Sequence, residues 1–223
     1  MKAEQEKKVF LIPLALWFIL IPIIVKVKFF ANPLTEYPWY GTTETLADFF
    51  LYYKSQAVTI VGVLMLIFFV WKIANSKKKE ALFSNETYLF IPLLIYLILT
   101  VFSTLFSEYK YFSSHGMPDQ FETIWNLIAY VIACVYAYYA IRFMDAERSM
   151  IAILFTGALP VSIICVLQYF KVDIYRLIYA DEGYSFTFAE ETVYGPFYNI
   201  NYVGYYTVLF VPVFLCCVWF QKI

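Results

Sequence analysis

The stretch that decides the fold reads IWNLIAYVIACVYAYYAIRF (residues 124–143), then MDAERSM (144–150), then IAILFTGALPVSIICVLQY (151–169). Two long apolar runs stand on either side of a short polar connection. A bilayer core about 30 Å thick needs roughly 20 mostly apolar residues per helix, so each run is long enough to cross a membrane. The stretch therefore predicts two antiparallel transmembrane helices joined by a tight hairpin.

Four further apolar runs flank this pair. None of the six has a charged residue in its interior, as expected of real spans, because a charge at the bilayer centre costs about 2.5–3.5 kcal/mol. The predicted spans are residues 9–25, 57–74, 88–106, 124–143, 151–169 and 202–220. The predicted fold class is therefore all-α, with residues 1–223 forming a single polytopic transmembrane helical domain of six spans.

The composition of the whole chain agrees with a membrane protein. Of its 223 residues, 62% are hydrophobic and only 15% are charged, whereas a soluble domain carries about 25% charged residues. A formal net charge of −1 argues against a nucleic-acid partner. The expected partner is the lipid bilayer, and the sequence leaves the oligomeric state unknown.

The distribution of charge predicts which side each connection faces. With the N-terminus in the cytoplasm, ten of the sixteen Lys and Arg residues fall in inner segments, and eleven of the seventeen Asp and Glu residues fall in outer segments. Basic residues accumulate in cytoplasmic loops, and the cluster Lys77–Lys79 is the strongest single indication. We therefore expect both termini in the cytoplasm and the long connections, roughly 26–56, 107–123 and 170–201, on the outer face.

The first of these connections contains an apolar stripe at helical spacing. Leu46, Phe49, Phe50 and Tyr53 recur at i, i+3, i+4 and i+7, which is typical of an amphipathic helix lying on a membrane surface. A simple helical extension of the second span explains the same spacing equally well.

Cysteine and histidine usage indicates no metal site. The cysteines all fall inside predicted spans: Cys134, Cys165, Cys216 and Cys217. We expect them to be small packing residues rather than disulfide partners. His115, the only histidine, falls in the second outer connection, where a solvated side chain is the first expectation and acid/base chemistry the alternative. No cofactor is expected.

The connection before the last span carries the most informative motif, GPFYNIN (residues 195–201), with Gly204 shortly after it. A Gly-Pro pair marks a turn, and Asn199 or Asn201 is placed to cap the following helix by accepting bonds from its free N–H groups. A capped helix N-terminus also attracts anions such as phosphate. Gly204 is expected to allow a close helix contact.

These residues resemble the N-terminal half of the O-antigen ligase/polymerase family of bacterial membrane proteins. That family often shows Gly-aromatic-Asn-Pro-Asn and a following Gly at the mouth of a span, and Gln168 at the end of the preceding span fits the same pattern. The resemblance covers roughly residues 88–212, and Ile200 stands where the family usually has Pro.

The resemblance implies an enzyme of the bacterial cytoplasmic membrane that works at its outer leaflet. Such ligases and polymerases transfer a glycan from a polyprenyl-diphosphate-linked saccharide to an acceptor hydroxyl during cell-surface polysaccharide synthesis. This chemistry needs cations for the departing diphosphate and a base for the acceptor. The family's main extracytoplasmic loop, with its essential Arg and His residues, lies beyond Ile223. We therefore expect this chain to be a fragment of a longer protein, and its catalytic residues are unknown.

The candidate substrate-binding residues are Arg176, Lys171, Asn199, Asn201 and Gly195. Arg176 leads because a guanidinium matches phosphate oxygens in a bidentate fork, although pairing with Asp173 or Asp181 accounts for it without a ligand. Lys171 and Lys110 are either secondary anchors or residues that snorkel at the ends of spans. The asparagines and Gly195 either line the substrate or serve only local structure.

Two further groups of outer residues have a functional and a structural interpretation. Glu122 is either a base or a helix N-terminal acid without a function. The aromatic residues either stack on sugar faces or pack the loops onto the membrane interface: Tyr175, Tyr179, Tyr184, Phe186, Phe188, Tyr194, Phe197 and Tyr198.

Two other functions fit a bundle of apolar helices. One is half of a transporter or channel, for which Pro92, Pro160 and Pro212 are candidate helix breaks, although the spans lack the intramembrane charges that usually mark an ion path. The other is a non-catalytic membrane protein that keeps only the first half of the fold.

Overall fold

The computed structural model of the chain describes residues 2–32, 35, 44–75, 87–117, 120–179, 192–197 and 199–220. The elements in order are α1 (Lys2–Ala15), a π-helical stretch (Leu16–Leu20), α2 (Ile21–Ile23), β1 (Lys28–Ala31), β2 (Thr45–Asp48), α3 (Tyr52–Asn75), a 3₁₀ turn (Thr87–Phe90), α4 (Ile91–Leu105), α5 (Lys110–His115), α6 (Ile124–Met144), α7 (Glu147–Tyr169), α8 (Ile174–Tyr179) and α9 (Ile200–Phe220). Some residues named above fall outside the described ranges: Lys77–Lys79, Asp181, Tyr184, Phe186, Phe188 and Tyr198.

Five helical segments are long and apolar enough to cross a membrane. They are α3, Tyr88–Leu105, α6, α7 and Ile200–Trp219. These segments overlap the last five predicted spans, so each of those five spans contains a helix of the required length and apolarity, and the all-α, polytopic fold class is confirmed. α7 and α9 continue through Pro160 and Pro212, and Pro92 lies in the first turn of α4, so none of the three prolines ends a helix.

The first predicted span, residues 9–25, differs from the other five. It is helical as far as Ile23 and leaves the helix at Ile24, whose backbone is extended. Its charge-free helical part, Val9–Ile23, is shorter than the roughly 20 residues that a bilayer core requires. The segment nevertheless packs into the bundle, where α1 contacts α3, α6 and α7. A sixth crossing therefore stays a prediction.

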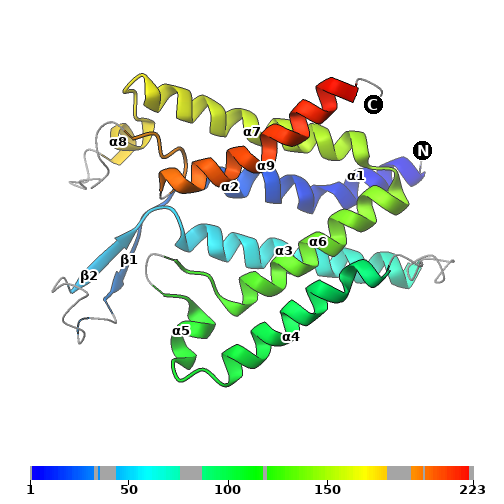
Figure 1. Cartoon of the computed structure of the whole chain (residues 1–223), viewed down its shortest axis with the longest axis horizontal. Coiled ribbons are helices and arrows are strands. Elements are labelled where there is room, and N and C mark those ends of the chain that lie inside the picture. The colour runs from blue at the N-terminus through cyan, green and yellow to red at the C-terminus, as the bar shows by residue number, and fades with distance from the viewer. Residues whose placement is uncertain are drawn as a thin grey trace.

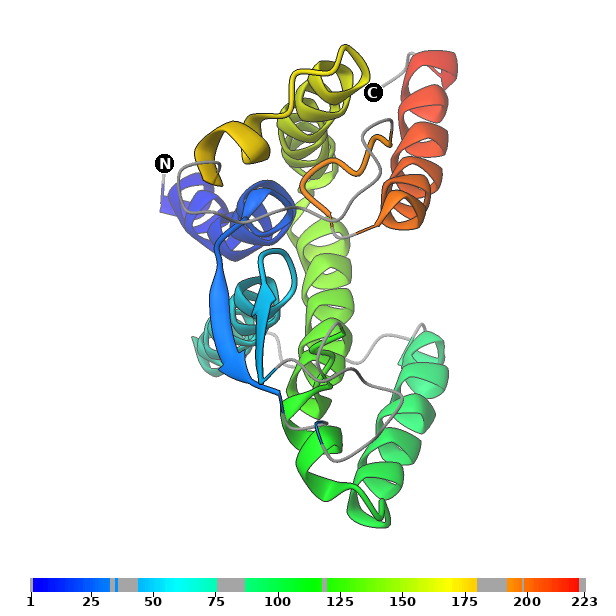
Figure 2. The same ribbon diagram turned by 90° about the vertical axis from the view of Figure 1, so that its left-hand side faces the viewer.

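The long helices run alongside one another, with the β hairpin, α5 and α8 at one end of the bundle (Figure 1). The start of α1 and the end of α9 both lie at the opposite end. Figure 2, seen from the hairpin end, shows α1 and α2 next to α3, α6 and α7, with α4 and α9 at the periphery. An even number of crossings predicts this placement of the two ends, and the choice of the cytoplasmic end rests on the charge distribution alone.

The core forms where α1, α3 and α6 meet. Phe10, Leu14, Met65 and Tyr136 are almost fully buried there. The rings of Phe10 and Tyr136 stack with centroids 4.2 Å apart, and the Tyr136 hydroxyl donates a 2.6 Å hydrogen bond to the Phe10 carbonyl. In a membrane, helix association rests on such close packing and hydrogen bonding, because lipid tails are as apolar as the side chains.

Two glycines allow the closest helix contacts. A Cβ added at Gly62 of α3 would lie 2.5 Å from the Cβ of Ala129 in α6. A Cβ added at Gly157 of α7 would lie 2.2 Å from the backbone carbonyl oxygen of Phe18, in the π-helical stretch. Neither pair of elements could approach this closely with a larger residue in place of its glycine.

A β hairpin replaces the surface helix predicted for the first outer connection. β1 and β2 pair antiparallel, with Lys28 opposite Asp48 and Ala31 opposite Thr45. The predicted amphipathic helix is therefore wrong, since Leu46 lies in β2 and Phe49 and Phe50 form a bend.

The alternative, a helical extension of the second span, holds only from Tyr52. Asp48 sets this start, because its carboxylate accepts hydrogen bonds from the backbone N–H groups of Leu51 and Tyr52 at 2.9 and 2.7 Å. Phe50 is buried against Tyr175 and Tyr194 rather than lying on a membrane surface.

Candidate functional site

The loop of residues 192–197 is fastened to the end of α7 by one side chain. The Oε1 atom of Gln168 accepts hydrogen bonds from the backbone N–H groups of Tyr194, at 3.1 Å, and Gly195, at 2.7 Å. Its Nε2 atom donates a longer bond of 3.4 Å to the Gly195 carbonyl. The turn that brings both N–H groups to Gln168 needs a glycine at position 195, because its φ of +59° is a conformation that residues with a Cβ rarely adopt. The turn expected from the Gly-Pro pair is present.

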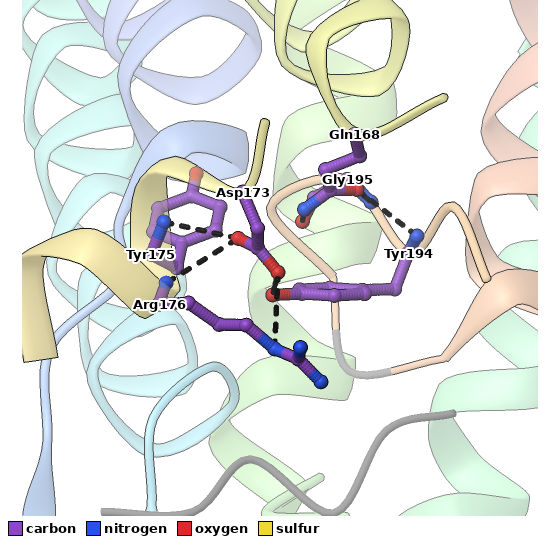
Figure 3. A network of polar contacts seen from close by, with 6 residues as sticks. All are labelled: Gln168, Asp173, Tyr175, Arg176, Tyr194 and Gly195. Atoms are coloured by element: carbon purple, nitrogen blue, oxygen red, sulfur yellow. Dashed lines mark hydrogen bonds and ion pairs between the residues drawn. The ribbon is translucent and has the colours of Figure 1, made fainter. Parts of the chain in front are cut away.

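A second group of contacts ties the same loop to α8 (Figure 3). The Tyr194 hydroxyl donates to Oδ2 of Asp173, and the Arg176 guanidinium pairs with the same oxygen at 3.8 Å. The other Asp173 oxygen accepts bonds from the backbone N–H groups of Tyr175 and Arg176. Burial, followed by the hydrogen bond to Asp173, raises the pKa of Tyr194 well above its usual value.

The loop also reaches α3, through Lys54. This half-buried side chain lies in the first turn of α3, and its Nζ donates a hydrogen bond to the carbonyl of Pro196. The ammonium lies over the rings of Phe50 and Phe197, at 5.9 and 5.0 Å from their centroids. One lysine is thus held among aromatic faces and a loop carbonyl.

Lys54 faces an open cavity of about 610 Å³, which we call the Lys54 cavity. Its walls come from the π-helical stretch, α2, α3, α6 and α9, together with the residues just before α6 and α9. Apolar and aromatic groups dominate the lining: Trp17, Phe18, Ile21, Pro22, Leu51, Val58, Phe121, Tyr130, Phe197, Tyr202, Tyr206, Leu209 and Phe210. The polar lining residues are Lys54, Ser55, Gln120, Glu122 and Asn126. Among the described residues, Lys54 is the one cation that lines this cavity.

Behind Lys54, a buried amide joins α3 to α6. The Oδ1 atom of Asn126 accepts hydrogen bonds from the hydroxyls of Ser55, Thr59 and Thr123, and its Nδ2 atom donates to the Ser55 carbonyl at 3.2 Å. Asn126 is only 2% exposed, and these bonds satisfy both ends of its side chain. The network fixes the wall on which Lys54 stands.

The structure brings two of the sequence-predicted site residues together. Gly195 and Arg176 are connected through Tyr194 and Asp173, as the preceding contacts show. The predicted pairing of Arg176 with Asp173 is present. Lys171 is exposed at the turn after α7, with a φ of 65°. None of these residues lines the Lys54 cavity.

The asparagines act at the start of α9. The Asn199 side chain accepts a 2.9 Å hydrogen bond from the backbone N–H of Asn201, which confirms the predicted capping, and both residues are exposed. Gly204, however, does not make the expected close helix contact. A Cβ added there would meet no atom of the described chain within 4 Å, because α9 turns this face outward.

The remaining candidates lie apart from one another. His115 is exposed at the end of α5, where its ring stacks on Tyr111 with centroids 4.6 Å apart. Glu122 lines the Lys54 cavity, and Lys110 is exposed at the start of α5. The four cysteines lie in α6, α7 and α9 and are not disulfide-bonded. Within the described ranges, no group of three His, Cys, Asp or Glu residues could hold a metal ion.

Lys54 and Asn126 are site residues that sequence reasoning missed. Lys54 stands just before the predicted second span, where an ordinary snorkelling lysine has the same pattern. Asn126 is a polar residue near the start of an apolar run, which was the one available signal.

The chain was compared with protein-family models, with curated proteins and with solved structures. None of the three comparisons found a match. The function must therefore be argued from the site itself.

Proposed function

We propose that this chain is the N-terminal membrane portion of an outer-leaflet glycan ligase or polymerase, and that it holds a polyprenyl-diphosphate-linked saccharide. The observation that carries the proposal is the Lys54 cavity. A lipid-linked diphosphate needs an apolar wall for its chain and a cation for its head, and the cavity offers both.

Lys54 is suited to the head group because it lies near the hairpin end of the bundle, which the charge distribution predicts to face the outer side of the membrane. The aromatic and aliphatic lining extends from there along α9 to Leu209 and Phe210. An isoprenoid chain buries apolar surface against such a wall, which stabilises the complex by about 25 cal/mol per Å². Glu122, the one acid among the described lining residues, is our candidate for the base that takes a proton from an acceptor hydroxyl.

The transporter alternative receives less support from the same helices. Its candidate breaks at Pro92, Pro160 and Pro212 do not interrupt α4, α7 or α9. Discontinuous helices near the middle of the membrane are typical of transporter sites.

The test is equilibrium binding of a radiolabelled polyprenyl diphosphate to the purified full chain in detergent. Lys54→Met should weaken binding about 10- to 100-fold, because a hydrogen bond to a charged group contributes about 1.5–3 kcal/mol. Lys26→Met is the matched control, since Lys26 lies over the Tyr53 ring at the same end but outside the cavity.

Equal binding by Lys54→Met and the unaltered protein would contradict the proposed site. A transferase and a transporter then differ in cells whose surface glycan depends on this gene. Lys54→Met in a transferase leaves lipid-linked saccharide on the outer leaflet, whereas in a transporter it leaves that saccharide on the inner leaflet. Arg176→Ala in the same cells tests the phosphate role expected from the sequence.

A further inference from the structure

A second cavity of about 420 Å³ opens at the hairpin end, between β1, α3, α5 and the start of α6. We call it the Gln56 cavity. Aromatic rings supply much of its wall, including Tyr52, Tyr111 and Trp125. No Lys, Arg, Asp or Glu is among the described residues that line it. Its chemistry therefore differs from that of the Lys54 cavity, which contains both a cation and an acid.

The polar groups of this second cavity are partly available to a ligand. The Oδ1 atom of Asn126 already occupies the hydroxyls of Thr59 and Thr123. The Nδ1 atom of His115 lies 2.8 Å from the Ser114 hydroxyl. In contrast, neither the Gln56 amide nor Nε2 of His115 has a hydrogen-bond partner within the described part of the chain. An amide and an imidazole nitrogen together can donate and accept.

We propose that the Gln56 cavity binds a neutral sugar unit. An anionic ligand would find no Lys or Arg among the described residues that line the cavity, and a purely apolar ligand that covered the exposed Gln56 amide and His115 imidazole would leave both without partners, which is costly. A sugar ring carries hydroxyls around its edge and C–H groups on its faces. Its edge suits Gln56 and His115, and its faces suit the flat rings of Tyr52, Tyr111 and Trp125.

The two cavities have one described lining residue in common. Phe121 lines both of them. It is 8% exposed, adopts a φ of 47°, and is packed by Gly116, where a Cβ would lie 2.7 Å from the Phe121 Cα. A sugar in the Gln56 cavity would thus lie next to a diphosphate in the Lys54 cavity. In this respect the inference rests on the proposed function, which supplies the lipid-linked saccharide.

The test uses saturation-transfer-difference NMR on the full chain in detergent, with methyl glycosides of neutral hexoses and N-acetylhexosamines as the probes. We expect saturation transfer to at least one glycoside, and Gln56→Ala should weaken its binding about tenfold. Gln5→Ala is the matched control, since Gln5 is exposed near the start of α1, and the start of α1 lies at the opposite end of the bundle (Figure 1). Gln56→Ala should still bind sugar-free polyprenyl diphosphate as the unaltered protein does.

Each failure points to a different claim. If the protein binds polyprenyl diphosphate but no neutral glycoside shows an NMR saturation-transfer signal, the sugar site is overturned and the proposed function stands. If a glycoside shows a saturation-transfer signal but the protein does not bind the lipid diphosphate, the result supports the sugar site and contradicts the proposed function. Equal glycoside binding by Gln56→Ala, or an equal loss of sugar and lipid binding, overturns the assignment of the sugar to this cavity.

Discussion

The backbone of Gly195 turns with a φ of +59°, a left-handed conformation that costs about 1–2 kcal/mol for a residue with a Cβ. This turn brings two N–H groups onto Gln168 and directs the carbonyl of the next residue to Lys54. The Gly-Pro pair was enough to predict a turn. The contact with Lys54 could not be predicted, because Lys54 and Pro196 are far apart in the chain and meet only through the packing of α3 against the loop.

Gly195→Ala should lower the free energy of unfolding by about 1–2 kcal/mol. The added Cβ needs a strained φ and would also lie 3.0 Å from Sγ of Cys165. Thermal unfolding in detergent measures the effect. Gly204→Ala is the matched control: it adds a Cβ in open space on a helix, and should be neutral or stabilising by about 0.5–1 kcal/mol. The same loss in both variants would contradict a special role for the Gly195 turn.

The helices that cross the bundle could be located from hydropathy, because a bilayer demands long apolar runs whatever their neighbours. The β hairpin could not, since a strand depends on a partner strand elsewhere in the chain. Leu46 to Tyr53 happen to show helical spacing, but the pairing of β1 with β2 and the Asp48 cap prevail. The π-helical stretch, Leu16–Leu20, likewise has no local signal, and it lies where α7 presses on it through Gly157.

Gly157→Ala should destabilise the protein by about 1–3 kcal/mol, the usual cost of overpacking. The Phe18 oxygen that the new Cβ would meet belongs to the backbone, so α7 or the π-helical stretch must shift as a whole. Ser162→Ala, on an exposed face of the same helix, is the control and should change stability by less than about 0.5 kcal/mol. If the thermal unfolding midpoint of Gly157→Ala equals that of the unaltered protein, α7 and the π-helical stretch are not in close contact at Gly157.

The whole molecule has two chemically different ends. The hairpin end carries both cavities, the 192–197 loop and α8, while the other end carries the start of α1 and the end of α9. At that second end, Lys72 pairs with Glu6 at 2.6 Å and Lys7 donates to the Asp145 carbonyl, which ties the start of α1 to α3 and to the α6–α7 connection. The charge distribution predicts that this second end faces the cytoplasm.

A membrane-impermeant maleimide tests that orientation in intact cells, in a background with the four native cysteines replaced by alanine. Lys110→Cys, at the start of α5, should be labelled without permeabilisation. Arg148→Cys, at the start of α7, should be labelled only after permeabilisation; both positions are exposed. The reverse pattern would invert the topology and move both cavities to the cytoplasmic side.

The contact between Lys54 and Pro196 makes a bound anion and the loop carbonyl compete for the same hydrogen-bond donor, the Lys54 ammonium. An anion that draws Lys54 to itself takes that donor from the Pro196 carbonyl, so ligand affinity and loop order are thermodynamically linked and each must change the other by the same factor. Because Gln168 and Tyr194 fasten the loop to α7 and α8, the ligated state would be communicated to two helices that the ligand itself does not touch. The loop would then act as a built-in sensor of whether the Lys54 cavity is filled.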